Sequence, residues 1–486
     1  MKKLLLAASL LIMTSFVNAQ YLNTATYITS RDADEIKEIL YERGWDTTAM
    51  STNGAEIYKI TYNTTDVFGN LTIASGALYV PQVDCDTLPL VSYQHGTEFH
   101  KEHVPSETWY YDRGFLYSGN GYITVLPDYL GLGDNPGLHP YIHWESEATA
   151  SIDLIRAARE FLNESLQKWD NNQLFLTGYS QGGHSTMAIH KYVTVNNLQD
   201  EFNIVASAPL SGPFPLYDFQ LPEMFGGDST YYAPEFIPYI FASYQMVYGN
   251  LYTFYNEYYD PPYDSIIGSW VASGTEWGTL PTNIYDFVQD SVLDNIQSNP
   301  NHPFNVDLRE NDLHNWIPEE AVRMLYCGMD SMVFPENSTM SLDTMIYLGA
   351  TDVQALNLDP NADHNGCFIP ATTYALVWFD NLRLEVCDSI AGPPVSVPTF
   401  EKQPEISLYP NPFSSSTIIE YELSGPGTAD ITIFNHLGQI VESTSLVNSQ
   451  SGKQQYVWNA SEMPAGIYFV QVRVGNEVTT RKMIKR

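Results

Sequence analysis

The sequence predicts two parts: an α/β fold with a mostly parallel sheet, helices on both faces and a helical cap, then a small C-terminal β-sandwich. Three observations predict this. Short apolar strands alternate with helical patterns over residues 20–390. An aromatic-rich run at 213–318 interrupts that alternation. After a proline-rich linker at 391–404, short alternating strands with turn residues fill 405–486.

Apolar runs bounded by turn residues are the expected strands. Those at 58–62 and 71–80 are joined by a short turn and should pair. The other runs of the first part lie at 88–94, 122–126, 174–177, 204–209, 323–328 and 353–358. Residues 148–166 carry apolar side chains at helical spacing, as expected for a helix that crosses over between parallel strands. The second part shows strand patterns at 429–434, 455–458 and 467–474.

The run at 213–318 is predicted to be an inserted, mostly helical cap over the carboxyl edge of the sheet. Tyrosine, phenylalanine, tryptophan and proline are frequent in it. We expect most of these aromatic side chains to fill the cap's own core. A subset should line a pocket, because ligand pockets are mostly apolar and aromatic.

The net charge of the chain and its first 19 residues indicate the cellular compartment and the classes of partner. With 22 basic and 57 acidic residues the net charge is −35, which disfavours nucleic acid and anionic membranes as partners. Two lysines, an apolar run and a small residue give residues 1–19 the form of a secretory signal peptide. No later apolar run is long enough to cross a membrane. The mature protein is therefore expected to be exported and soluble, without a transmembrane segment.

The strongest motif is Gly178-Tyr179-Ser180-Gln181-Gly182, a G-x-S-x-G sequence between an apolar strand and a helical pattern. This context predicts a strained turn that exposes the Ser180 hydroxyl above the sheet, with glycines where a Cβ would clash. A serine hydroxyl is a poor nucleophile unless a base accepts its proton. Ser180 is therefore the candidate nucleophile, and a carboxylate and then a histidine are expected later in the chain.

The candidate base is His364. Of the histidines far enough downstream, His302 and His314 fall in the cap and His436 falls in the second part. His364 follows the last predicted strand of the sheet, in a loop that we expect to be flexible and able to reach Ser180.

The candidate acid is Asp330, directly after the strand at 323–328. A carboxylate at this place holds the histidine tautomer and stabilises the imidazolium. Asp352 precedes the wrong strand, and Asp363 stands too close to His364 in sequence to reach its ring.

An oxyanion hole needs two backbone N–H groups directed at the developing negative charge. One is expected from Gln181, the residue after the nucleophile. The other is expected from the loop after the strand at 88–94, where Thr97 is the first candidate and Gly96 the second.

The cysteines leave the disulfides open. Two disulfides with three possible connectivities, or four buried thiols, are compatible with Cys85, Cys327, Cys367 and Cys387. Cys327 and Cys367 each stand three residues from a predicted catalytic residue, so a bridge between them is one of these options. His139 and His143 are four residues apart, but Pro140 argues against a helical pair of ligands, so no metal or cofactor is expected.

Residues 55–370 resemble the α/β-hydrolase superfamily, and within it the secretory lipases of the fungal lipase A type and their bacterial relatives. The pieces that carry the resemblance are Ser75-Gly76, Val80-Pro81, Tyr93 to Thr97, Pro127 to Gly133, His139-Pro140-Tyr141, the Ser180 motif, Asp330 to Pro335 and His364. The resemblance implies a lipase or esterase with a cap inserted between later strands. The cap here is rich in tyrosine rather than aliphatic, which argues against activity on long-chain fat.

Residues 405–486 resemble the C-terminal sorting domain of type IX secretion substrates. The matching segments are 408–413, Gly438, 464–469 and the basic end at 481–486. The resemblance implies a type IX secretion machinery as partner, with a location outside a Gram-negative cell or on its outer surface, reached through the periplasm. The alternative is a carbohydrate-binding β module.

The sequence therefore predicts a secreted serine hydrolase that cleaves carboxylic esters. An aromatic-ester or polysaccharide-deacetylating esterase is equally compatible with these residues. One alternative is a serine peptidase on the same fold, because the same triad cleaves amides. Another is a non-catalytic surface-binding protein, because fold does not fix function.

Overall fold

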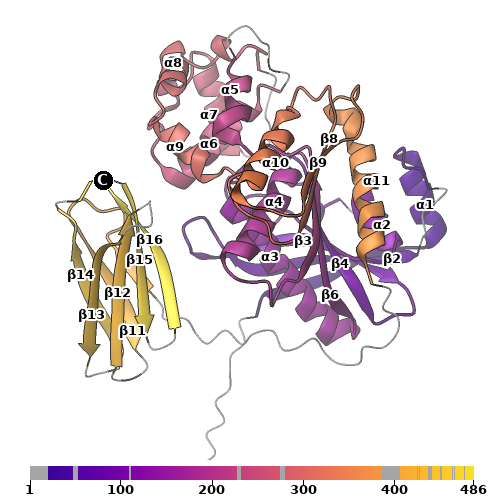
Figure 1. The fold of residues 1–486 in the computed structure, drawn as a ribbon, viewed down its shortest axis with the longest axis horizontal. Helices are drawn as coiled ribbons and strands as arrows, with labels where there is room; N and C mark the ends of the chain where they lie inside the picture. Colours follow the sequence, from indigo (N-terminus) through magenta and orange to yellow (C-terminus); the bar gives the residue numbers. More distant parts are fainter. Residues whose placement is uncertain are drawn as a thin grey trace, which may run out of the picture. The chain divides into compact units, whose positions relative to one another are not determined.

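The computed structural model describes residues 20–47, 53–108, 111–226, 231, 233–273, 280–384 and 406–486, the last range with short gaps at 424, 426, 436–439, 449–450, 462, 465 and 475–476. The chain forms two compact units (Figure 1), a larger one at Gln20–Val397 and a smaller one that contains Pro398–Arg486. The predicted signal peptide and linker lie outside the described residues. No helix among the described residues is long and apolar enough to cross a membrane.

A nine-stranded sheet forms the centre of the larger unit, in the order β1-β2-β3-β5-β4-β6-β7-β8-β9. The strands are β1 (Leu22–Arg31), β2 (Gly54–Thr65), β3 (Leu71–Gln82), β4 (Thr87–Gln94), β5 (Ile123–Pro127), β6 (Trp169–Tyr179), β7 (Ile204–Leu210), β8 (Ala321–Tyr326) and β9 (Val353–Asn357). Every pair from β5 to β9 is parallel, whereas β1, β2 and β3 run antiparallel to their neighbours. The prediction of a mostly parallel sheet is confirmed.

Helices cover both faces of the sheet (Figure 1). One core cluster joins the sheet to α3, α4 and α10, and the other joins it to α1, α2 and α11. These helices are α1 (Ala33–Glu42), α2 (Asp112–Gly119), α3 (Trp144–Phe161), α4 (Gln181–Val195), α10 (Glu336–Leu348) and α11 (His364–Leu382). The helix predicted at 148–166 begins at Trp144 and continues from α3 into a π-helix, η1 (Leu162–Leu166).

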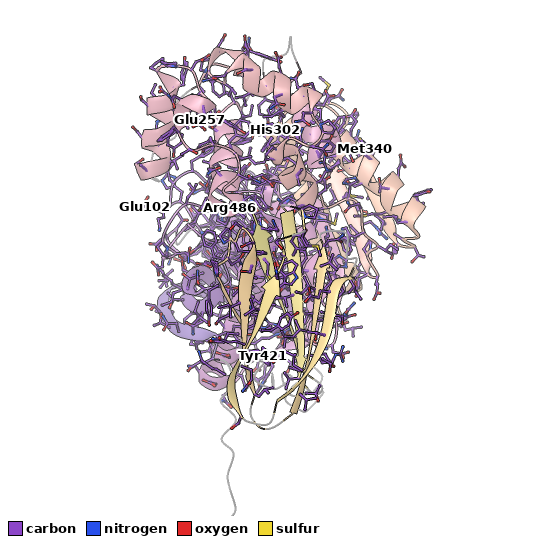
Figure 2. All side chains as sticks on the ribbon, turned by 90° about the vertical axis from the view of Figure 1, so that its left-hand side faces the viewer. Glu102, Glu257, His302, Met340, Tyr421 and Arg486 are labelled. Atoms are coloured by element: carbon purple, nitrogen blue, oxygen red, sulfur yellow. A yellow bond between two sulfur atoms is a disulfide. The ribbon has the colours of Figure 1, made fainter. Side chains whose placement is uncertain are left out.

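A mostly helical cap is inserted between β7 and β8, and its helices gather at one end of the sheet (Figure 1). Its elements are η2 (Leu216–Gln220), α5 (Leu221–Met224), α6 (Phe236–Tyr248), η3 (Tyr255–Glu257), α7 (Tyr263–Ser273), η4 (Ile284–Asp286), α8 (Asp290–Ser298) and α9 (Pro303–Glu310). Its aromatic side chains form a separate core, in which Phe241 packs against Phe304 and Tyr258. Figure 2 labels Glu257 and His302 within this cap.

Hydrogen bonds fix α6 of the cap to the segment before α3. Ser243 Oγ donates to the carbonyl of Tyr141, and Tyr244 Oη donates to the carbonyl of Ile142, each at 3.1 Å. The backbone of Ile142 has a φ of 56°, which is costly for a β-branched residue. The cap is thus attached at a strained segment that also lines the candidate site described below.

The smaller unit consists of antiparallel strands in two sheets, β10-β11-β14 and β13-β12-β15-β16. The strands are β10 (Ile406–Tyr409), β11 (Ser416–Leu423), β12 (Gly427–Asn435), β13 (Ile440–Asn448), β14 (Gly452–Asn459), β15 (Gly466–Val474) and β16 (Glu477–Lys485). Its core contains Ile419, Ile431 and Trp458, together with Tyr421, which Figure 2 labels. The predicted β-sandwich is confirmed.

Candidate active site

Ser180 stands in a sharp turn between β6 and α4. Its backbone has φ 61° and ψ −119°, and its N–H donates to the carbonyl of Leu210 at 2.9 Å. A Cβ on Gly178 or Gly182 would lie 2.4 or 2.0 Å from the carbonyl oxygen of Gln94. Only glycine fits at these two positions, and the turn that results places Ser180 at the amino end of a helix.

Asp330 and His364 are in direct contact. His364 Nδ1 lies 2.7 Å from Asp330 Oδ2, and both residues are buried. The other carboxylate oxygen of Asp330 accepts the N–H groups of Met332 and Val333 at 3.0 and 2.9 Å. With the proton on Nδ1 donated to the carboxylate, His364 Nε2 is left to accept a proton.

The expectation that His364 lies in a flexible loop is wrong. It is the first residue of α11, and Asp363 caps this helix by accepting the N–H of Gly366 at 2.8 Å. Asp352, the other carboxylate weighed as the acid, pairs with Arg323 at 2.7 Å.

Ser180 is linked to His364 through its neighbour Tyr179. The Tyr179 hydroxyl donates to the carbonyl of His364, and the two rings lie 5.0 Å apart. Among the described residues, no hydrogen bond joins Ser180 Oγ to His364. Catalytic hydrogen bonds are often long without substrate and tighten only when it binds.

A disulfide ties the segments that carry the acid and the base. Cys327 follows β8 and Cys367 lies in the first turn of α11, and the structure joins them with a Cα–Cα distance of 5.7 Å. The sequence had left this pairing open. The Cys85 thiol donates to the carbonyl of Thr87 at 3.2 Å, and Cys387 lies outside the described residues.

The residues expected to form an oxyanion hole lie beside Ser180. A Cβ on Gly96 would be 3.8 Å from Ser180 Cβ, so the loop after β4 runs against the turn. Thr97 follows, and its Oγ1 lies 2.9 Å from Tyr141 Oη. Gln181 is the first residue of α4, where main-chain N–H groups lack partners within the helix.

A buried chain of polar side chains that was not predicted from the sequence lies behind the turn. Gln181 Nε2 lies 2.7 Å from His139 Nε2 and 2.8 Å from Glu147 Oε1. Glu147 Oε2 lies 2.7 Å from His184 Nδ1. Burial alone raises the pKa of Glu147, but the charge and hydrogen bond of His184, with the bond from Gln181, lower it overall. Burial lowers the pKa of His139 to about 4.

Several other histidines of the described residues serve other contacts, and His436 lies outside those residues. His143 and His302 accept N–H groups at the starts of α3 and α9, and His190 bonds Glu320 at 2.8 Å. His139 Nδ1 bonds the carbonyl of Leu130, and His143 Nδ1 bonds Ser146 Oγ.

A narrow apolar pocket opens beside Ser180. The cap supplies half of its lining residues, and its volume is about 40 Å³. The lining residues from the cap are Leu216, Gln220, Leu221, Met224, Tyr231, Phe236 and Ile240, and those from elsewhere are Tyr141, Ile142, Ser180, Gln181, Pro213, Met332 and Val333.

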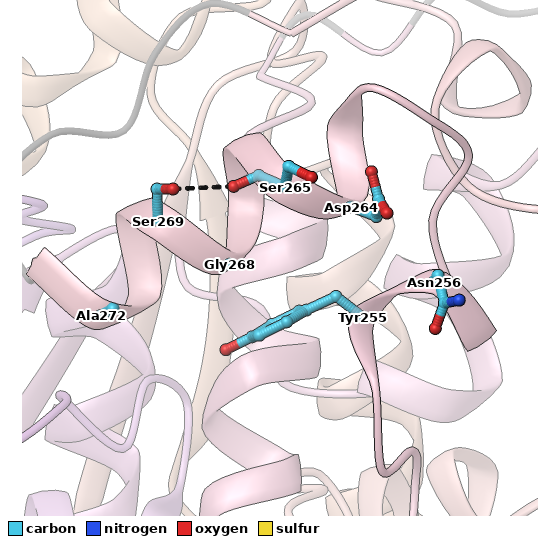
Figure 3. Close-up of a pocket in the computed structure, with 7 residues that line it drawn as sticks. All are labelled: Tyr255, Asn256, Asp264, Ser265, Gly268, Ser269 and Ala272. Atoms are coloured by element: carbon cyan, nitrogen blue, oxygen red, sulfur yellow. Dashed lines mark hydrogen bonds between the residues drawn. The ribbon is translucent and has the colours of Figure 1, made fainter.

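Two other features lie away from Ser180. The first is a pocket of about 440 Å³ between η3 and α7 of the cap, where Tyr255 lies across Gly268 (Figure 3). The second is a group that could offer three metal ligands, formed by Asp218, Asp312 and His314. Lys191 already donates to the carbonyl of Asp312 at 3.0 Å, which places a cation at this group.

A family model for the secretion system C-terminal sorting domain matches residues 407–486. This match agrees with the resemblance of the terminal motifs and points to secretion or attachment to the cell surface. No curated protein matches the chain by sequence.

Solved structures match about three quarters of the chain. The rice cell wall degrading esterase LipA from Xanthomonas oryzae is 27% identical with a TM-score of 0.66, over 75% of this chain and 100% of that one. A putative hydrolase from Legionella pneumophila is 24% identical with a TM-score of 0.68, over 75% and 99%. Candida antarctica lipase A in its closed state is 15% identical with a TM-score of 0.55, over 76% and 84%. The chain therefore has the α/β-hydrolase fold of these proteins, which supports a hydrolase.

Proposed function

We propose that the protein is an exported serine hydrolase that cleaves carboxylic esters. The observation that carries this proposal is the buried bond between His364 and Asp330, next to a serine held at positive φ at the start of α4. The similarity to the esterase LipA supports an ester as the substrate.

In the proposed reaction Ser180 Oγ attacks the ester carbonyl carbon and His364 Nε2 accepts its proton. Asp330 keeps the other proton of the imidazole on Nδ1 and stabilises the imidazolium. The alcohol leaves with the proton from His364, and an acyl group remains on Ser180. Water then attacks this acyl group with His364 as base, which releases the acid and restores the serine.

The negative charge on the carbonyl oxygen is proposed to be held by the main-chain N–H groups of Gln181 and Thr97, with Gly96 as the alternative second donor. Such donors stabilise charge that develops only in the transition state. The amino end of α4 adds a favourable dipole at the same place. These steps use side chains, backbone amides and water.

Export is proposed to use both ends of the chain. Residues 1–19 would direct entry into the periplasm, and residues 405–486 would direct passage through the type IX machinery to the outer surface of a Gram-negative cell. The match of residues 407–486 to the sorting-domain model supports the second step.

The direct test is hydrolysis of p-nitrophenyl butyrate by the full chain and by Ser180→Ala. The variant is expected to lose at least about 10³-fold in kcat, because the nucleophile is gone and only residual transition-state binding remains. Undiminished hydrolysis by a folded Ser180→Ala protein would overturn the proposal.

A further inference from the structure

The pocket beside Ser180 is small. Its volume of about 40 Å³ is well below the roughly 150 Å³ of an engineered cavity that binds benzene. It therefore has room for a small group only. Its walls belong to the packed core of the cap, where the side chains of Leu216, Leu221 and Ile240 are each at most 3% exposed.

Three residues that line the pocket, Gln220, Tyr231 and Tyr141, have their polar groups occupied by the protein, whereas Gln181 Oε1 has no hydrogen-bond partner. Gln220 Nε2 donates to the carbonyl of Met332 at 3.0 Å, and its Oε1 accepts from Asn337 at 2.6 Å. Tyr231 Oη donates to the same carbonyl at 3.0 Å, and Tyr141 Oη is bonded to Thr97. None of the described residues that line the pocket is charged. Beyond Ser180, a group bound in the pocket therefore contacts a mostly apolar wall.

We propose that this pocket takes the acyl group of the ester and restricts it to short, apolar chains. This inference rests on the proposed function. The acyl group stays on Ser180 through both steps, whereas the alcohol leaves after the first. A narrow pocket beside Ser180 therefore suits the acyl group. Charged acyl groups find no oppositely charged partner among the lining residues and are disfavoured.

The experiment measures kcat/KM of the full chain for p-nitrophenyl acetate, butyrate, octanoate and palmitate. Butyrate or acetate is expected to exceed octanoate by at least about tenfold, because a pocket discriminates roughly 10-fold or more per misfitting methylene. Leu221→Ala removes part of the pocket wall, and it should raise the octanoate-to-butyrate ratio by about tenfold. Leu293→Ala is the matched control, because Leu293 is buried in the same cap core but does not line the pocket.

The outcomes separate this inference from the proposed function. Ser180-dependent hydrolysis that is equal for all chain lengths, or highest for palmitate, overturns the inference and leaves the proposed function standing. An equal change of the octanoate-to-butyrate ratio in Leu221→Ala and Leu293→Ala also overturns the inference and leaves the proposed function standing. If Leu221→Ala does not fold, Ile240→Val provides a smaller enlargement of the same wall and must shift the ratio in the same direction. If no ester of any length is cleaved, both fail.

The buried polar side chains behind the turn support a second, independent inference. They are those of Gln181, His139, Glu147 and His184. His139 Nδ1 faces the carbonyl of Leu130 at 2.8 Å and must donate, so its Nε2 accepts from Gln181. The same Gln181 amide nitrogen donates to Glu147, and Gln181 Oε1 has no hydrogen-bond partner. The Gln181 side chain is therefore held through its nitrogen alone.

We infer that Glu147 is a positioning residue that acts through Gln181. By fixing this side chain at the first turn of α4, it keeps the Gln181 main-chain N–H directed at the oxyanion. Glu147 is also held from its other carboxylate oxygen, which lies 2.7 Å from His184 Nδ1. This inference too rests on the proposed function.

Glu147→Met tests it, with Glu320→Met as the matched control, because methionine cannot accept the hydrogen bond from Gln181. Glu320 also pairs with a histidine of α4, His190, but far from Ser180 along the helix. Displacing an oxyanion donor should cost less than losing it, so Glu147→Met should lower kcat about tenfold while KM stays within about twofold. Glu320→Met should leave both constants unchanged.

Gln181→Met supplies a second variant. It keeps the main-chain N–H and the approximate side-chain volume but cannot bond Glu147, so it should show the same fall in kcat. Unchanged kcat in both variants, with only a lower melting temperature, would mean that these buried polar side chains have only a structural role. That result would overturn the inference.

Discussion

At Ser180 the backbone conformation is imposed by residues outside the turn. The carbonyl oxygen of Gln94 lies close to the two flanking glycines, and the carbonyl of Leu210 accepts a hydrogen bond from the serine N–H. The motif could be recognised in the sequence because its residues are consecutive. The role of Glu147 could not be recognised in this way, because it lies 34 residues from Gln181 and 37 from His184. Nothing in its local sequence distinguishes it from a glutamate that faces solvent.

Asp330→Asn tests the role of the acid. Asparagine keeps the shape of the side chain but can favour the wrong histidine tautomer, so kcat is expected to fall by about 10³–10⁴-fold with little change in melting temperature. Asp352→Asn is the control, because this aspartate pairs with Arg323 away from His364. Comparable loss in both variants, or loss only in Asp352→Asn, would refute the assignment of the acid.

At the scale of elements, strands were predictable and the start of α11 was not. Buried parallel strands give continuous apolar runs, so the predicted runs fall on β2 to β9. The edge strand β1 was missed because its side chains are mostly exposed or half-buried. The segment at His364 was predicted as a loop, whereas α11 begins there and contains Pro370, a residue that is unfavourable inside helices.

The disulfide between Cys327 and Cys367 should stabilise the segments that carry Asp330 and His364. It closes a loop of 40 residues, for which the chain-entropy model gives about 4 kcal/mol. Cys327→Ser is expected to lower the free energy of unfolding by about 2–4 kcal/mol. Guanidinium unfolding checks this.

Dithiothreitol should produce the same loss in the unmodified chain and none in Cys327→Ser. Equal stability of the oxidised and reduced chains would show that the bridge does not contribute.

At the scale of the whole molecule, the division into a hydrolase unit and a sandwich unit could be predicted because both hydrophobic period and turn composition change along the chain. Contacts between side chains that lie far apart in the sequence could not be predicted. The pocket depends on how residues near 141, 180, 220 and 332 converge, and sequence pattern does not encode that convergence.

Stability should fall in acid partly through His139. Burial lowers its pKa to about 4 in the folded protein, against about 6.5 in the unfolded chain. Between these values the unfolded chain binds a proton that the folded protein does not, so the free energy of unfolding decreases as pH falls from 6.5 to 4. The full contribution is on the order of 3 kcal/mol.

Urea unfolding of the unmodified chain and of His139→Gln at several pH values between 7 and 4 measures this. The buried carboxyls of Asp128 and Asp153, whose pKa values burial raises to about 6, give the opposite slope but are present in both proteins. His139→Gln should therefore lose stability less steeply as the pH falls. Parallel curves would contradict the neutral, buried state of His139.

The most direct measurement of the central claim is labelling of the full chain with a fluorophosphonate probe, followed by peptide mass spectrometry. A single modified residue, Ser180, is expected, with labelling abolished in Ser180→Ala and strongly slowed in His364→Ala, because the serine needs its base. No labelling of the folded protein, or labelling at another residue that persists in Ser180→Ala, would contradict the central claim.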